Sequence, residues 1–147
     1  MKYRTISTLV AMMLSCCASA FAHHIAIVAQ TQNSVQNLST AELGKILKSN
    51  TMKWPNGRDI VVVINRNSTD SMEVLQRLAG LPAGKAQTFV AEHKSLFVVV
   101  DSDTEVLELV AARAGALGIM PVRSVDSSIK VLKIDGKLPL EKGYLPD

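Results

Sequence analysis

Cysteine is almost absent from this sequence. The 147 residues include only two, Cys16 and Cys17, and both lie in the leading segment that we expect to be removed during export. A mature chain that begins at residue 23 would therefore contain no thiol. This composition excludes a disulfide, a zinc–thiolate site and a cysteine nucleophile from the mature protein.

An apolar run long enough to cross a bilayer is also missing. The leading apolar run ends at Leu14 and is too short for a membrane-spanning helix. It follows Lys2 and Arg4 and precedes Ala20-Phe21-Ala22, which has the small residues of a signal-peptide cleavage site. We therefore predict a secretory signal over residues 1–22, cleavage after Ala22, one domain over residues 23–147 and a periplasmic location.

Lipidation at Cys16 is the alternative fate of the leading segment. A lipidated cysteine usually has leucine three positions before it, and this sequence has Met13 there. Cleavage after Ala22 is therefore the favoured prediction.

The mature chain carries little net charge. The full sequence has 16 basic and 13 acidic residues, and Lys2 and Arg4 leave with the signal. The remaining 14 basic residues give a net charge of about +1, which removes the electrostatic basis for nucleic-acid binding. We expect no nucleic-acid partner.

The three histidines do not form a catalytic arrangement. His23 and His24 would lie at the mature N-terminus, and His93 lies near the end of an expected helix. None has the context of a nucleophile and its base, so we expect neither an enzyme nor a cofactor. A free His23 could chelate copper through its imidazole and α-amine, but a polar terminus without metal is the favoured interpretation.

Short apolar strands alternate with helices that carry start signals. We expect strands near residues 24–30, 59–65, 95–100, 116–120 and 129–134. Expected helices begin at Ser39 with Glu42, at Asp70 with Glu73, at Pro82 and at Ser102 with Glu105. The helix from Pro82 should end at His93, and Gly115 should stop the last helix. This order predicts an α/β domain whose sheet is mixed or mostly parallel and is flanked by helices.

Four segments in order resemble the second lobe of the phosphate-binding proteins of bacterial ABC transporters. These proteins belong to the type II periplasmic binding protein superfamily. The segments are LSTAELGKIL, MKWPNGRDIVVVINR, EVLELVAARAGALGIMP and IKVLKIDGKLP. Trp54, Pro55 and Gly57 match the family's W-P-x-G turn, and Gly115, Ala116 and Gly118 match a later glycine-rich segment. The resemblance covers nearly the whole mature chain and implies a single periplasmic-binding-protein-like lobe with an oxyanion ligand, phosphate in particular.

The chain departs from the family in three respects. The family's two-lobed members bind their anion between lobes, and this sequence matches only one lobe. The family's oxyanion loop has arginine followed by Ser-Gly-Thr, whereas this sequence has Arg66, Ser68 and Thr69 with no glycine between the hydroxyl residues. Ile119 stands where a tyrosine is common.

The candidate ligand-binding residues lie in one loop at a predicted helix start. An N-terminus with unpaired N–H groups attracts anions, arginine can bind an oxyanion through two hydrogen bonds, and hydroxyl groups can donate more. An aspartate at this position could accept the proton of hydrogenphosphate. The predicted binding residues are Arg66, Asn67, Ser68, Thr69, Asp70 and Ser71. The alternative is that Asp70 only caps a surface helix.

The expected partners follow from the single lobe. A membrane transporter or sensor would bind the protein, and a homodimer would complete the cleft. The alternative function is a non-transport interaction or sensory-accessory protein that kept the lobe without the ligand.

Overall fold

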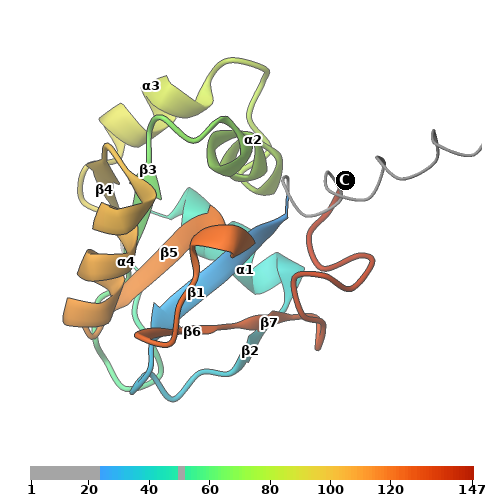
Figure 1. Cartoon of the computed structure of the whole chain (residues 1–147). Helices are drawn as coiled ribbons and strands as arrows, with labels where there is room; N and C mark the ends of the chain where they lie inside the picture. The colour runs from blue at the N-terminus through green and yellow to red at the C-terminus, as the bar shows by residue number, and fades with distance from the viewer. Residues whose placement is uncertain (1–23, 50–51) are drawn as a thin grey trace, which may run out of the picture.

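A computed structural model describes residues 24–49 and 52–147. The predicted signal peptide, its cleavage site, Cys16 and His23 lie outside the described residues. A five-stranded sheet forms the centre, in the order β4, β3, β5, β1, β6 (Figure 1). The strands are β4 (Phe97–Val100), β3 (Val61–Asn65), β5 (Ala116–Pro121), β1 (Ile25–Gln30) and β6 (Ile129–Val131).

The sheet is mixed, and one strand runs against the others. β3 pairs in parallel with β4 and with β5, whereas β1 pairs antiparallel with β5 and with β6. Four strands therefore share a direction, and the start of β1 lies at the same edge of the sheet as the carboxyl ends of β3, β4 and β5. A small second sheet pairs β2 (Asn37–Leu38) in parallel with β7 (Lys133–Ile134). The predicted α/β class and mixed sheet are confirmed.

The helices cover the two faces of the sheet unequally. α1 (Thr40–Lys48), α2 (Thr69–Leu78) and α3 (Ala86–Glu92) pack in one apolar cluster with β1, β3 and β5. α4 (Asp103–Ala112) packs on the opposite face in a separate cluster (Figure 1). The interior strand β3 is buried between these layers, as its continuous β-branched run predicts.

The glycine-rich match to the binding-protein family has a packing reason. A Cβ at Gly118 would lie 2.6 Å from Val28 Cγ2 and 2.9 Å from Val110 Cγ2, so glycine lets α4 lie close on β5 and β1. A Cβ at Gly115 would lie 2.1 Å from the Asp59 carbonyl oxygen. Gly115 was expected to stop α4, which was wrong. The helix ends at Ala112, and Gly115 permits a close backbone crossing instead.

Two of the predicted helix starts are confirmed. Ser39 and Glu42 form the predicted capping box of α1. Ser102 caps α4 by accepting the Glu105 N–H. The Glu105 carboxylate accepts the Asp101 N–H at 2.8 Å and so also closes the start of the helix.

The other two predicted helix starts were wrong. Ser68, not Asp70, caps α2, because the Ser68 hydroxyl accepts the Ser71 N–H while Asp70 already lies in the first turn. α3 begins at Ala86 instead of Pro82. Gly84 has a positive φ of 76°, so the chain makes a turn between Pro82 and the helix.

Tyr144 anchors the C-terminal segment to the end of the sheet. Its side chain is buried, its hydroxyl donates to the Leu132 carbonyl oxygen at 2.7 Å, and it accepts the Ile27 N–H at 3.1 Å. Burial raises the pKa of Tyr144 to about 12, although the hydrogen bond from Ile27 opposes the shift. The hydroxyl therefore takes the place of a backbone group between β1 and the chain that leaves β6.

Within residues 24–49 and 52–147, no helix has the length and apolar character needed to cross a membrane.

Candidate functional site

Two loops meet where the parallel strands β3 and β4 end. One loop, residues 66–68, leads from β3 into α2, whose first turn contains the other three predicted binding residues, and the second loop leads from β4 into α4. The Arg66 N–H donates to the Val100 carbonyl oxygen at 3.0 Å, which holds the two loops side by side. Ligands of open α/β sheets bind at this edge, because the loops and helix N-termini gather there.

Asp103 connects three strands at this edge. Its carboxylate accepts the Asn65 amide at 2.9 Å and the Ser124 hydroxyl at 3.0 Å. Asn65 is only 7% exposed, and its Oδ1 accepts the Asn67 N–H at 2.9 Å. One hydrogen-bond network thus joins the end of β3, the start of α4 after the β4 loop, and the 3-10 turn Val122–Ser124 that follows β5.

Arg66 is held by an exposed ion pair. Its Nε lies 2.5 Å from Asp101 Oδ1, with the side chains 57% and 59% exposed. Asn67 adds a hydrogen bond from its amide to the Asp101 carbonyl oxygen at 2.9 Å, and the Gln87 amide donates to the Arg66 carbonyl oxygen at 2.9 Å. Only Nε of Arg66 is used, so its two terminal nitrogens donate to no described residue.

The hydroxyl residues of the loop divide into two kinds. Ser71 is fully buried, and the Ser68 hydroxyl donates to the Ser71 hydroxyl at 2.9 Å while it accepts the Ser71 N–H at 3.3 Å. These two serines therefore satisfy one another. Thr69 is exposed, and its hydroxyl and N–H have no hydrogen-bond partner among the described residues. Asp70, in the first turn of α2, is half-buried.

Sequence reasoning missed the partners of the loop. None of Asp101, Asp103, Asn65 and Ser124 was among the predicted site residues. Their position could have indicated them, because each lies at the carboxyl end of a strand or shortly after it. Which strands lie beside one another was the missing information.

A pocket of about 310 Å³ opens beside the loop. Arg66 and Thr69 line it from the loop, and the other lining residues come from α2, from the turn before α3 and from α3 itself. Met72 and Ala86, both buried, form its apolar side. Two of the six predicted residues therefore face a hollow, and Ser71 is enclosed in the protein.

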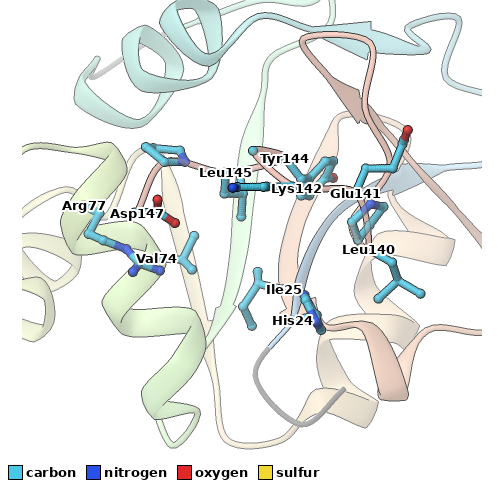
Figure 2. A pocket seen from close by; sticks show the side chains of 13 residues that line it. His24, Ile25, Val74, Arg77, Leu140, Glu141, Lys142, Tyr144, Leu145 and Asp147 are labelled. Carbon is cyan, nitrogen blue, oxygen red and sulfur yellow. The ribbon is translucent and has the colours of Figure 1, made fainter. Parts of the chain in front are cut away.

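A second pocket, of about 420 Å³, lies away from the predicted loop. It opens between α2, the start of β1 and the C-terminal segment (Figure 2). Figure 2 shows Arg77 and Val74 of α2 on one side and His24 and Leu140 on the other. None of residues 66–71 lines this pocket.

Among the described residues, the histidines and carboxylates do not gather into a metal centre. No group of three or more histidine, cysteine, aspartate or glutamate side chains is placed to hold a metal ion within residues 24–49 and 52–147. His93 caps the end of α3, where its Nδ1 lies 2.8 Å from the Phe89 carbonyl oxygen and its ring packs on Phe89.

Several solved structures with this fold are described as phosphate-binding or phosphate-transport proteins. An ABC-type phosphate transport receptor from Vibrio cholerae is 24% identical, with a TM-score of 0.63 over 79% of this chain and 48% of its own. A Clostridium perfringens protein assigned as a phosphate ABC transporter substrate-binding protein, with bound phosphate, is 21% identical, with a TM-score of 0.63 over 79% and 46%. A phosphate-binding protein from Stenotrophomonas maltophilia is 21% identical, with a TM-score of 0.62 over 82% and 41%.

These matches establish the fold. The chain has the fold of one lobe of a periplasmic binding protein and spans less than half the length of these structures. No protein-family model matches the sequence. The search of curated proteins also found no match.

Proposed function

We propose that the protein is a non-enzymatic periplasmic binding protein and that the loop of residues 66–71 holds an oxyanion of the phosphate type. One observation carries the proposal. Arg66 and Thr69, with donors that no described residue uses, lie together at the start of α2, at the edge of the sheet where such folds bind ligands. The named neighbours, one of them solved with phosphate, support the same ligand class.

The direct contacts would come from part of the loop. The terminal nitrogens of Arg66 suit two oxygens of an oxyanion, and the Thr69 hydroxyl and N–H would donate to a third. The partial positive charge at the start of α2 favours the anion further. Ser68 and Ser71 would act by shaping the loop, because their hydroxyl groups already bond one another. Asp70 would accept the proton of hydrogenphosphate.

The described lobe supplies one wall of such a site. Binding proteins of this fold close two walls on their ligand, so a second copy of the chain, or a membrane transporter or sensor, would supply the other. An open, one-walled site retains less affinity, because fewer contacts offset the cost of immobilising the ligand. The alternative, a sensory-accessory protein without a ligand, predicts no anion response at all.

Thermal unfolding in increasing phosphate tests the proposal. We expect phosphate to raise the melting temperature, since a ligand at a hundredfold excess over its dissociation constant adds about 2.7 kcal/mol. Arg66→Ala and Thr69→Val should each abolish the response. Arg58→Ala is the matched control, because Arg58 is an exposed arginine in the turn that precedes β3. The same melting temperature with and without millimolar phosphate would sink the proposal.

Asp70→Asn tests how phosphate is recognised. Under the proposal, the loss of the carboxylate should reduce the preference for phosphate over sulfate, because sulfate carries no proton to donate. The ratio of the two dissociation constants is the measurement. A ratio equal to that of the unmodified protein would remove Asp70 from the site.

A further inference from the structure

We infer that the loop of residues 66–71 takes a small phosphate monoester that carries an ammonium or hydroxyl group at its far end, in preference to inorganic phosphate. The inference rests on the proposed function and extends it to the pocket beside the loop. That pocket has room for more than an anion, because about 310 Å³ lies at the lower end of the range for small-molecule sites.

The pocket continues from the loop along one stripe of α2. Thr69, Glu73 and Gln76 line it, and they follow one another at helical spacings of four and three residues. A helix rises about 1.5 Å per residue, so Glu73 lies about 6 Å along the axis from Thr69. A phosphoryl group at Thr69 and Arg66 would therefore leave a two- or three-carbon chain pointing toward Glu73.

The chemistry of the far end follows from which groups are already used. Glu73 is exposed, and its carboxylate has no partner among the described residues. Gln76 uses its carbonyl oxygen on the Gly84 N–H at 3.1 Å, and Gln87 uses its amide nitrogen on the Arg66 carbonyl oxygen. The Glu73 carboxylate and the Gln87 oxygen remain as acceptors, which suit an ammonium or hydroxyl donor.

The apolar lining of the pocket suits a short carbon chain. Met72 is 7% exposed and Ala86 is 5% exposed, and both line the pocket together with its polar residues. An ester linkage would therefore lie against apolar side chains while its ends meet opposite charges, Arg66 at one end and Glu73 at the other. Inorganic phosphate would leave this space to water.

Calorimetric titration of the full mature chain tests the inference, with phosphoethanolamine, glycerol 3-phosphate, inorganic phosphate and ethanolamine as probes. We expect phosphoethanolamine to bind about tenfold more tightly than inorganic phosphate, and ethanolamine alone not to bind. Glu73→Gln should bring the affinity ratio of phosphoethanolamine to inorganic phosphate close to one. Glu92→Gln is the matched control, an exposed acid at the end of α3 that lines neither pocket, and should leave the ratio unchanged.

The outcomes separate the two proposals. Equal affinities for phosphoethanolamine and inorganic phosphate in the unmodified protein would overturn the monoester inference and leave the oxyanion function standing. An affinity ratio that survives Glu73→Gln would overturn the assigned role of the pocket. No binding of any phosphate-containing probe would overturn the proposed function itself.

Discussion

The loops that lead into α2 and α4 follow neighbouring parallel strands, and each begins its helix with a serine. Ser68 accepts the N–H of Ser71, and Ser102 accepts the N–H of Glu105, each three residues later. The two starts therefore share the same capping hydrogen bond, and such a cap stabilises each helix by about 1 kcal/mol. What differs is the side chain at the third helical position.

The start of α4 is closed by its own carboxylates. Glu105 folds back and accepts the Asp101 N–H at 2.8 Å and the Ser102 hydroxyl at 3.2 Å, and Asp103 lies in the same turn. In α2 the corresponding position is Ser71, a buried residue too short to reach back. The two helix starts thus differ. In α4 a carboxylate folds back onto the cap, whereas α2 has Asp70 as its only first-turn acid and places Arg66 and Thr69 beside a hollow.

α1 supports this contrast as a third case. Glu42 accepts the Ser39 N–H at 2.7 Å, and the Asp135 carboxylate accepts the Thr40 hydroxyl at 2.5 Å and the Thr40 N–H at 3.2 Å. The hydrogen bonds from Thr40 hold the pKa of Asp135 below its usual value. In both α1 and α4, a carboxylate therefore accepts backbone N–H groups at the start of the helix, in addition to the serine cap.

Among the substitutions considered, removal of the Asp103 carboxylate should lower the stability of the protein most, because Asp103 joins the two loops. We expect Asp103→Ala to lower the free energy of unfolding by about 3 kcal/mol, because the buried Asn65 amide and the Ser124 hydroxyl both lose a charged acceptor. Urea denaturation measures the change. Asp103→Asn should recover much of the loss, because its carboxamide keeps an acceptor for Asn65.

Thr104→Ala is the control for Asp103→Ala. Thr104 is the next residue of α4 and is exposed, and its side chain has no hydrogen-bond partner among the described residues. It should change the unfolding free energy by less than about 0.5 kcal/mol. If Asp103→Ala has an equally small effect, the network between the loops does not stabilise the protein, and the two helix starts are independent.

Local sequence signals predicted much of the fold. The strands, the capping box at Ser39 and the cap at Ser102 depend on residues close together in the chain. The cap of α2 was misassigned, because both Ser68 and Asp70 can cap a helix and Glu73, three residues after Asp70, favoured Asp70. The sequence alone does not show at which of these residues the helix begins. The actual cap pairs with Ser71, whose complete burial is a tertiary property.

The candidate site could be predicted only in part. Residues 66–71 do lie together, because they are consecutive, and their position after a strand was expected. The hydrogen-bond partners of Arg66 come from other elements, because Asp101 accepts from its Nε and Gln87 donates to its carbonyl oxygen. The packing of strands and helices decides which side chains reach the loop. Long-range pairing of this kind leaves no local pattern in one sequence.

Substitution of the two serine caps should lower the stability by smaller and unequal amounts. Ser102→Ala should cost about 1 kcal/mol, as an ordinary cap does. Ser68→Ala should cost about 2 kcal/mol, because it also removes the hydrogen-bond partner of the fully buried Ser71 hydroxyl. Denaturation midpoints of the two variants give the comparison. Equal losses would mean that Ser71 finds another partner and that the start of α2 is no more constrained than that of α4.

The smallest effect should come from the ion pair that joins the two loops directly. Arg66 and Asp101 are more than half exposed, and exposed pairs of this kind contribute about 0.5 kcal/mol. A double-mutant cycle of Arg66→Ala and Asp101→Ala should give a coupling energy of about that size, and 1 M salt should remove most of it by screening. A salt-insensitive coupling above about 2 kcal/mol would show that Asp101 fixes Arg66 in place. The weak coupling matters for the proposed function, because an incoming oxyanion then reaches the guanidinium without having to displace a strongly bound carboxylate.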